Sequence, residues 1–287
     1  MSSGLPRALS RAVRAPAKLN LYLKVLGRRP DGYHELDSVM ARLDLADRVR
    51  LFLRPGPDRL TSAASLPGGL PAGFDGPGNL VLKAAAAYRR RAGWPDEGLE
   101  IRLEKHIPVS AGLGGGSSDG AAVLAALNRA SPRPLAPGAL LELGRSLGAD
   151  LPFFLQPRPL VRAGGRGEIF SPAPAAFKIW AGRRIFLYKP DFNLSTAEVF
   201  KNLGLTNPPA DNNLGPVSEP GENDLWAAAA GLAPALAGAA GAVRALAPEA
   251  WGLSGSGPTF WFFSPRKSPA ALEEGGGWLR PARIALR

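Results

Sequence analysis

Alternation of hydrophobic and polar residues along the chain predicts a series of strands. The first is AKLNLYLKVL at residues 17–26, where lysine or asparagine alternates with leucine or valine at the two-residue period of a half-buried strand. Residues 54–79 are instead rich in proline and glycine, and we expect them to be mostly loop. Further runs with strand character lie at residues 35–53, 99–105, 180–188, 260–263 and 279–287.

Alanine- and leucine-rich runs between these strands predict helices. Asn79 is expected to cap one helix, because its side chain can accept a bond from a free N–H group of the first turn. Gly93 is expected to end that helix by adopting the left-handed conformation. Ser117, Ser118 or Asp119 is expected to open another helix. Further helices are predicted at residues 140–147 and 196–203, with an interrupted pair at residues 225–246.

The stretch from Leu225 to Val243 carries no charged residue and therefore has to be weighed as a membrane span. It consists mainly of alanine and glycine and is broken by Pro234, so two short helices fit it better. Residues 1–16 contain arginines but no apolar stretch of secretory-signal length, and we expect them to form a flexible leader. These patterns predict a soluble, cytoplasmic protein with no membrane partner.

The amino-acid composition limits the number of domains and the kinds of partner and metal ion to expect. With 287 residues, 45% of them hydrophobic, the chain is expected to form two domains, residues 1–160 and 161–287, with the boundary near residues 157–167. Its 35 basic and 24 acidic residues favour partners that carry phosphate. With no cysteine and two histidines, no protein metal ligands are assigned, and any metal is expected to be a hard ion such as Mg²⁺.

The strongest chemical signal is a glycine-rich run between a predicted strand and a predicted helix. Glycines let backbone N–H groups approach an oxyanion, and a helix N-terminus adds about half a positive charge directed at it. The spacing is not that of a P-loop, and the acidic partner of a dinucleotide fingerprint is missing. The residues predicted to bind phosphate are Pro108, Val109, Ser110, Ala111, Gly112, Leu113, Gly114, Gly115, Gly116, Ser117 and Ser118.

The run PVSAGLGGGSS resembles the ATP-binding motif of the GHMP kinase superfamily, and its GLGGGSS form is similar to members that act on 4-diphosphocytidyl-2-C-methyl-D-erythritol. Three further segments agree in kind, order and approximate spacing: PAKLNLYLKVLGRRPDGYHEL, GADLPFFL at residues 148–155 and GLSGSGPTFW at residues 252–261. Ser110 and Ala111 stand where the family pattern has glycines. The resemblance implies ATP and Mg²⁺ as cofactors and a two-domain α+β architecture with the active site in the inter-domain cleft.

The resemblance also implies a catalytic pair. Residue patterns alone favour ordinary roles, because Asp150 follows a helix and a glycine as a turn residue does, and Lys18 lies on a strand. In the family, the catalytic residues are the lysine of PAKLN and the aspartate of GAD, which correspond here to Lys18 and Asp150. The carboxylate would take the proton of the acceptor alcohol, and the ammonium would stabilise the transferring phosphoryl charge.

Substrate-binding candidates follow from the same resemblance. Tyr33 and His34 come just after a glycine turn, an exposed position from which flat rings can stack on a nucleobase. The family implies that this pair, with Asn20, lies at the cytidine end of the substrate. The residues alone leave open a packed tyrosine and a solvated histidine. Nearby Lys24, Arg28 and Arg29 are expected either to attract a diphosphate or to form a solvated face.

The implied function is transfer of the γ-phosphoryl of ATP to the 2-hydroxyl of 4-diphosphocytidyl-2-C-methyl-D-erythritol, in non-mevalonate isoprenoid precursor biosynthesis. A homoserine, mevalonate or sugar kinase of the same superfamily is the first alternative. The second is a nucleic-acid-binding module that uses the net charge of +11, although the basic residues are spread along the chain. We expect no nucleic-acid partner and a monomer or homodimer.

Overall fold

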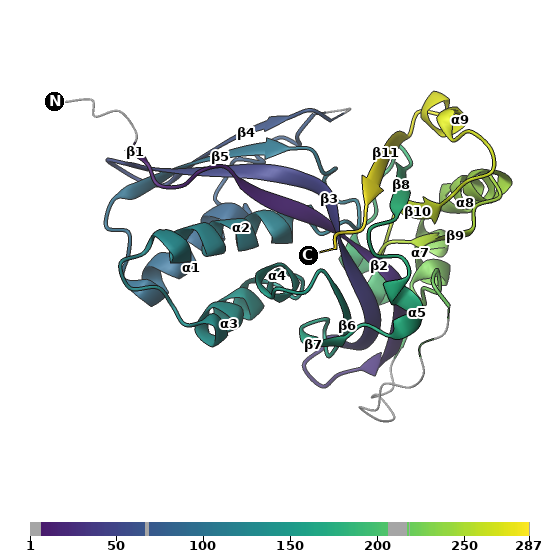
Figure 1. The fold of residues 1–287 in the computed structure, drawn as a ribbon, viewed down its shortest axis with the longest axis horizontal. Coiled ribbons are helices and arrows are strands. Elements are labelled where there is room, and N and C mark those ends of the chain that lie inside the picture. Colours follow the sequence, from purple (N-terminus) through teal and green to yellow (C-terminus); the bar gives the residue numbers. More distant parts are fainter. Residues whose placement is uncertain (1–6, 67–68, 206–216, 218, 287) are drawn as a thin grey trace. The chain divides into compact units, whose positions relative to one another are not determined.

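The structure, a computed structural model, describes residues 7–66, 69–205, 217 and 219–286 (Figure 1). The chain forms two compact units that alternate along the sequence. The first consists of Met1–Ala17, Leu45–Val109 and Gly114–Pro157, and the second of Lys18–Asp44, Ser110–Leu113 and Arg158–Arg287. Both units combine helices with strands, which confirms the predicted α+β class. The division into residues 1–160 and 161–287 stays a prediction.

Two long strands, β2 (Val13–Arg28) and β3 (His34–Arg54), contribute residues to both units. Gly32, with a φ of 83°, lies in the turn between them and donates its N–H to the carbonyl of Arg29. A left-handed glycine suits this turn because it has no Cβ to clash. The larger sheet has the strand order β4-β5-β3-β6-β7, and β1 and β2 also pair with β3.

In the first unit, helices α1–α4 lie on one side of strands β3, β4 and β5 (Figure 1). Strand β5 pairs antiparallel with β3 and parallel with β4. The elements of this unit, besides parts of β2 and β3, are β1 (Arg7–Ala8), β4 (Arg59–Ala64), α1 (Leu80–Ala92), β5 (Gly98–Lys105), α2 (Gly115–Ala130), α3 (Pro137–Leu147) and α4 (Leu151–Leu155).

The core of the first unit follows from its strand and helix periodicities. On β5, Ile101 and Leu103 are buried while Arg102 between them is exposed, so the strand buries the face toward the helices. Helix α1 begins and ends as predicted. The Asn79 side chain accepts a hydrogen bond from the N–H of Val81, and Gly93 closes the helix in the left-handed conformation with a φ of 65°.

The second unit contains a four-stranded antiparallel sheet in the order β11-β8-β10-β9. Its elements, besides parts of β2 and β3, are β6 (Leu160–Gly164), β7 (Ile169–Pro172), α5 (Ala175–Lys178), β8 (Arg184–Lys189), α6 (Thr196–Asn202), α7 (Trp226–Leu232), α8 (Ala235–Ala245), β9 (Ala250–Leu253), β10 (Phe260–Phe263), α9 (Ala270–Glu274) and β11 (Trp278–Arg283).

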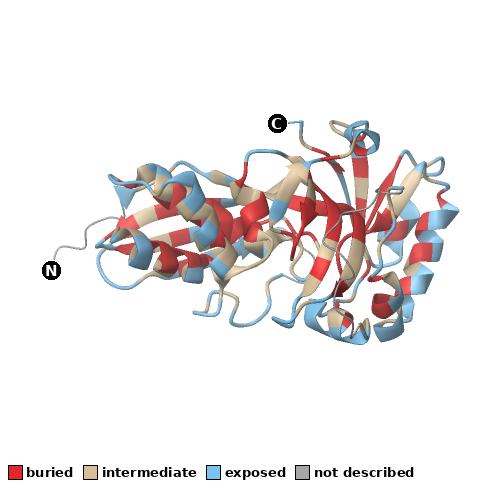
Figure 2. Ribbon diagram, turned by 90° about the horizontal axis from the view of Figure 1, so that it is seen from below, coloured by how far each residue is buried: buried red, intermediate tan, exposed pale blue. Residues whose placement is uncertain are grey.

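The core of the second unit is built around β10, whose four aromatic residues are all fully buried. Helices α7 and α8 contribute alanine, leucine and valine side chains to the same cluster. Pro234 separates these two helices, as the sequence predicts for the uncharged stretch. Figure 2 shows buried residues on the strands and on the inward sides of the helices. Among the residues described, every helix is too short or too polar to traverse a lipid bilayer.

Three expectations from the sequence are wrong in part. The loop expected over residues 54–79 contains β4, which pairs with β5 from Arg59↔Glu100 to Ala64↔Lys105. The leader expected over residues 1–16 contains β1 and the start of β2, and its residues 1–6 lie outside the described part. The strand expected from residue 180 begins at Arg184, after a turn. In each case, pairing with a distant strand decides the outcome.

The helix expected to open at Ser117, Ser118 or Asp119 begins earlier. Helix α2 starts at Gly115, and its N-cap is Gly114 with a φ of 66° and no side-chain capping bond. The glycines therefore form the first residues of the helix instead of a loop that precedes it. This difference matters for the site, because Ser117 and Ser118 lie within the first turn.

Candidate active site

The glycine-rich run connects β5 to α2 through left-handed backbone. Ser110 has a φ of 53°, Gly112 of 72° and Gly114 of 66°. Left-handed residues are common in backbone turns whose N–H groups bind anions. Since α2 has 16 residues and opens without a side-chain cap, the N–H groups of its first turn remain available to a phosphate oxygen.

In the second unit, Gly112 packs against the segment GLSGSG at residues 252–257. A Cβ on Gly112 would lie 2.3 Å from the carbonyl oxygen of Ser254, so no other residue fits here without a shift. The hydroxyl of Ser254 donates to the Gly112 carbonyl at 3.0 Å. The neighbouring carbonyl of Leu113 accepts a hydrogen bond from the Lys18 N–H at 2.9 Å. These contacts hold the tip of the run against Lys18 on β2.

The Lys18 side chain is buried and held by a short hydrogen-bonded chain. Its ammonium donates to Oδ1 of Asn20 at 2.7 Å, and the Asn20 amide donates to the hydroxyl of Ser38 at 2.8 Å. Ser38 in turn donates to the carbonyl of Tyr22 at 2.7 Å. A Cβ on Gly255 would lie 3.4 Å from the Lys18 ammonium. The ammonium therefore lies against backbone that carries no side chain.

Asn20 has a structural task that the sequence did not indicate. Both ends of its side-chain amide are used within the protein, by Lys18 and Ser38. The backbone carbonyl of Asn20 accepts a hydrogen bond from the indole N–H of Trp261 at 3.0 Å. The role of Asn20 in substrate binding stays a prediction, whereas its contacts orient Lys18.

Asp150 lies in the first unit, at the residue that precedes α4. Its backbone carbonyl accepts a hydrogen bond from the N–H of Phe153 at 3.2 Å, while its side chain makes no capping bond to the helix. The residue is partly exposed. The carboxylate thus is not consumed as a helix cap, the ordinary role that its sequence context suggests.

The predicted aromatic pair lies at the turn between β2 and β3 in the second unit. Tyr33 is 54% exposed, and the guanidinium of Arg166 lies over its ring at 4.8 Å from the ring centroid. The imidazole of His34 stacks on Phe200 with ring centroids 5.1 Å apart. Burial, followed by the charge of Arg28, lowers the pKa of His34. The histidine is therefore neutral at pH 7 and offers both a donor and an acceptor.

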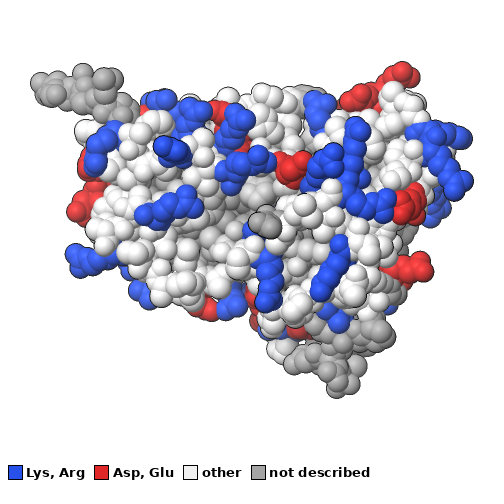
Figure 3. Space-filling view, viewed as in Figure 1, with Lys and Arg blue, Asp and Glu red and all other residues white. Residues whose placement is uncertain are grey.

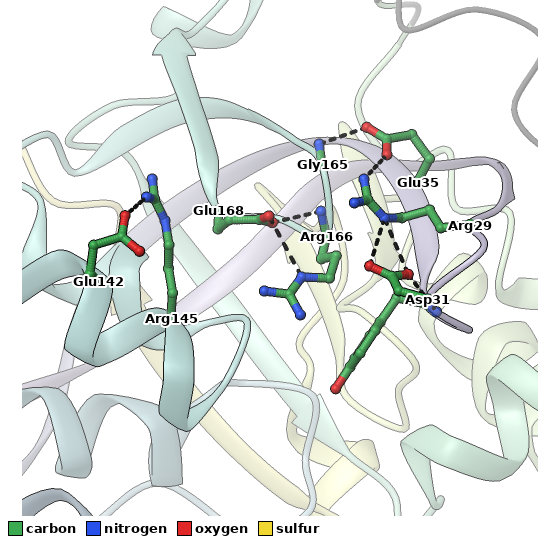
Figure 4. Close-up of polar contacts among 9 residues, drawn as sticks. Arg29, Asp31, Glu35, Glu142, Arg145, Gly165, Arg166 and Glu168 are labelled. Atoms are coloured by element: carbon green, nitrogen blue, oxygen red, sulfur yellow. Dashed lines mark hydrogen bonds and ion pairs between the residues drawn. The ribbon is translucent and has the colours of Figure 1, made fainter. Parts of the chain in front are cut away.

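A backbone hydrogen bond joins this region to the turn between β6 and β7, and ion pairs lie on both sides of it (Figure 4). Arg29 donates to Glu35 at 2.6 Å, and the other carboxylate oxygen of Glu35 accepts from the N–H of Gly165 at 3.0 Å. Glu168 accepts from the N–H of Arg166 at 2.6 Å. Because Arg29 contacts Asp31 as well, its charge is already neutralised within the turn.

Three residues of this arrangement were missed by the sequence reasoning: Ser38, Arg166 and Phe200. Ser254, by contrast, lies in the segment GLSGSGPTFW that the sequence analysis names. The three missed residues have no local signature. Their roles depend on contacts that the folded chain makes over long sequence separations, such as the 18 residues between Asn20 and Ser38.

Comparison with known proteins agrees with this geometry. The family model for the GHMP kinases N terminal domain matches residues 79–157, which include the glycine-rich run and Asp150. A crystal structure of 4-(cytidine 5'-diphospho)-2C-methyl-D-erythritol kinase is 33% identical, with a TM-score of 0.71 over 95% of this chain and 99% of that one. A mevalonate kinase, 14% identical with a TM-score of 0.63, covers 96% of this chain and 99% of its own length and shares the fold. The fold and the glycine-rich run are those of a GHMP-type kinase.

Relatives with high sequence identity identify one family among the GHMP-type kinases. The 4-diphosphocytidyl-2-C-methyl-D-erythritol kinase of Citrifermentans bemidjiense is 37% identical over 281 residues, 93% of this chain and 96% of the relative. That of Pelobacter propionicus is 38% identical over 94% of this chain and 96% of the relative. The chain belongs to the family of 4-diphosphocytidyl-2-C-methyl-D-erythritol kinases.

Proposed function

We propose that this protein transfers the γ-phosphoryl group of ATP to the 2-hydroxyl of 4-diphosphocytidyl-2-C-methyl-D-erythritol, a step of non-mevalonate isoprenoid precursor biosynthesis. The observation that carries the proposal is the identity of 37% to a kinase of that name over 93% of the chain. The glycine-rich run and the buried Lys18 support it independently. The proposed reaction is a direct in-line transfer and requires no phosphoenzyme.

The nucleotide phosphates are proposed to bind along residues 108–118. The left-handed backbone at Gly112 and Gly114 and the uncapped start of α2 support this assignment, because both present N–H donors to an anion. Gly116 is exposed, and a Cβ placed on it would meet no atom of the described residues within 4 Å. Space for a phosphate is therefore present beside the helix start.

Mg²⁺ is proposed to bind mainly through nucleotide oxygens. In the described part of the chain, no group of three or more His, Cys, Asp or Glu residues is placed to hold a metal ion. The hydroxyl of Ser118 is buried and has no hydrogen-bond partner, and Ser117 precedes it in the same turn. A hydroxyl oxygen is a suitable ligand for this hard cation. When bound, Mg²⁺ would neutralise charge on the β- and γ-phosphates.

Asp150 is proposed as the general base and Lys18 as the cation that stabilises the transferring charge. A carboxylate that is not used as a helix cap can accept the proton of the acceptor hydroxyl. Asn20 orients the Lys18 ammonium by accepting a hydrogen bond from it. A preorganised ammonium stabilises developing negative charge without reorganisation during the reaction.

Tyr33 and His34 are proposed to recognise the cytosine. The exposed ring of Tyr33 offers a face for stacking, and the neutral His34 offers a donor and an acceptor for the base edge. The Phe200 ring stacks on the His34 ring and so helps to fix its orientation. Asn20 is proposed to contribute indirectly, by orienting Lys18.

The test is ADP release from ATP, Mg²⁺ and 4-diphosphocytidyl-2-C-methyl-D-erythritol, run beside mevalonate, homoserine and galactose. Turnover on the cytidylyl substrate alone, abolished in Asp150→Asn, is the expected result. Turnover on another alcohol would retain the kinase class and overturn the substrate. Figure 3 shows Lys and Arg side chains spread over the visible face instead of aligned in a stripe, which does not favour the nucleic-acid alternative.

A further inference from the structure

A cluster of three buried charges lies in the first unit, outside the residues proposed for catalysis. Asp47 is 0% exposed, Lys105 is 2% exposed and Asp119 is 1% exposed. The Lys105 ammonium donates to Oδ2 of Asp47 and, at 2.7 Å, to Oδ2 of Asp119. The three side chains come from β3, the last residue of β5 and the first half of α2, so the cluster connects three elements.

Asp47 fixes the chain where it leaves β5. Its Oδ1 accepts hydrogen bonds from the N–H groups of His106 at 2.5 Å and Ile107 at 2.9 Å. These two residues come directly before Pro108, the first residue proposed to bind nucleotide. One carboxylate therefore holds both the Lys105 ammonium and the backbone that enters the glycine-rich run.

Asp119 fixes the other end of the run. It lies one turn into α2, and its bond to Lys105 ties that turn to the end of β5. A Cβ on Gly115 would lie 3.2 Å from the Lys105 ammonium and 3.1 Å from a side-chain carbon of Ile107. The absence of a side chain at Gly115 thus allows the start of the helix to pack closely on the cluster.

Stability alone is a weak reason for such a cluster. Burying charges costs free energy, and buried ion pairs can often be replaced by hydrophobic residues without loss of stability. Moreover, Oδ1 of Asp119 is buried without a hydrogen-bond partner, which adds an unfavourable contribution. One ammonium between two carboxylates also leaves a net negative charge close to a helix N-terminus, where an anion is proposed to bind.

We infer that Lys105 and Asp119 are positioning residues for the nucleotide: the ammonium joins the two ends of the glycine-rich run and sets the geometry and charge that ATP meets there. The inference rests on the proposed function, because it takes the run to be the ATP site. Lys105 acts through the backbone of residues 106–107 and through α2, without itself touching the ligand.

Lys105 keeps its charge inside the cluster. Burial alone would lower the pKa of Lys105, but the two carboxylates together raise it. Asp47 on β3 and Asp119 on α2 both accept hydrogen bonds from its ammonium. One cation therefore holds both ends of the run at once.

The decisive comparison is Asp119→Ala with Asp119→Asn. Alanine removes the acceptor that ties α2 to the Lys105 ammonium, whereas asparagine keeps an oxygen that can accept the same bond. The KM for ATP is expected to rise at least about threefold in Asp119→Ala and by less in Asp119→Asn. The KM for the alcohol and kcat are expected to remain within about twofold in both variants.

Two further variants complete the experiment. Lys105→Met removes the ammonium and is expected to raise the KM for ATP by about tenfold or more. Asp58→Asn is the matched control, because Asp58 holds the opposite end of β5 through the N–H of Leu99 and pairs with Arg89 in the same unit. It is expected to leave the KM for ATP within about twofold of that of the unaltered protein.

The outcomes separate the inference from the proposed function. No ATP turnover by the unaltered protein overturns both. Turnover with an unchanged KM for ATP in Asp119→Ala overturns the inference alone, as does an equal change in the KM values for ATP and alcohol. If Lys105→Met does not fold, the comparison of Asp119→Ala with Asp119→Asn still decides.

Discussion

At the level of single residues, Lys18 and Asp150 differ in how the fold prepares them. Lys18 is buried and oriented by Asn20, whereas Asp150 is partly exposed and precedes a short helix. Neither residue closes a helix or fills a core cluster. Substitutions at both positions should therefore act on the reaction more than on folding.

Asp150→Asn and Lys18→Ala are each expected to fold normally and bind ATP, yet to lower kcat by at least roughly a hundredfold, because each removes a group needed at the transition state. Steady-state kinetics with circular dichroism and an ATP-binding measurement check this. Asn20→Ala should show a smaller loss, since it releases the Lys18 ammonium without removing it. Near wild-type turnover of either catalytic variant would contradict the assignment.

Tyr33→Ala is expected to raise the KM for the cytidylyl substrate by about five- to a hundredfold, the range that corresponds to the loss of one stacked base. Tyr33→Phe keeps the ring and should change KM little. Arg166→Gln removes the cation over the Tyr33 ring and should give an intermediate increase. The KM for ATP should not change in any of them, and a shift there would argue against this subsite.

At the level of elements, the glycine-rich run combines two constraints. Gly112 is restricted by its φ of 72° and by the Ser254 carbonyl. Gly116 lies in helix α2, and a Cβ added to it would meet no atom of the described residues within 4 Å. An alanine at Gly112 therefore tests the effect of backbone strain. An alanine at Gly116 tests the effect of filling the space proposed for the ligand.

Gly112→Ala is expected to lower both the melting temperature and ATP affinity, because the new Cβ collides with backbone and requires a strained φ. Gly116→Ala should preserve or raise the melting temperature, because alanine favours a helix by up to about 1 kcal/mol over glycine. It should still weaken ATP binding, since the methyl group occupies the space proposed for phosphate. Unchanged ATP affinity in Gly116→Ala would place the phosphates elsewhere.

Local signals explain which elements could be predicted. Helix α1 has a capping asparagine and a terminating glycine, and the pair α7 and α8 has a proline at its break, so neighbouring residues suffice. Strand β4 has the weak sequence RLTSAA and exists by pairing in parallel with β5, about 40 residues away. A parallel partner leaves no hairpin signal in the sequence.

At the level of the whole molecule, the two units are not consecutive in sequence. Residues 18–44 belong to the second unit with residues 158–287. Strand β6 pairs with β3 through Ser38–Ala41, and Leu23 bridges to Asn223 and packs in the core of that unit. Separation of the chain near residue 160 would remove these contacts.

A fragment of residues 161–287 expressed alone is accordingly expected not to fold cooperatively, because it lacks the β2 and β3 residues that complete its sheet and core. A shallow unfolding curve and poorly dispersed NMR resonances would show this. Co-expression of residues 1–160 supplies the missing strands and is expected to restore folding. A fragment that unfolds cooperatively by itself would support the simple division at residue 160.

The stability of the whole molecule should also report the ionisation of Asp119. Its folded pKa is raised to about 7 from 3.8, so the folded state binds the proton more tightly than the unfolded state. The contribution of Asp119 to the free energy of unfolding therefore falls as pH rises from about 4 to about 7 and is constant above that. Melting temperatures of the unaltered protein and Asp119→Asn should diverge across this window, and parallel curves would contradict the raised pKa.

The sequence alone was sufficient for the α+β class, for most helices and strands, and for the glycine-rich run, because periodicity, capping residues and glycine conformations act over a few neighbouring residues. The tertiary structure decided which side chains support the candidate site. Ser38 holds Asn20, Ser254 meets Gly112, and Asp47 joins Lys105 to the start of the run. Such contacts link residues up to 142 positions apart. They are selected by the need to satisfy buried polar groups once distant strands have packed, and that need has no signature in a local stretch of sequence.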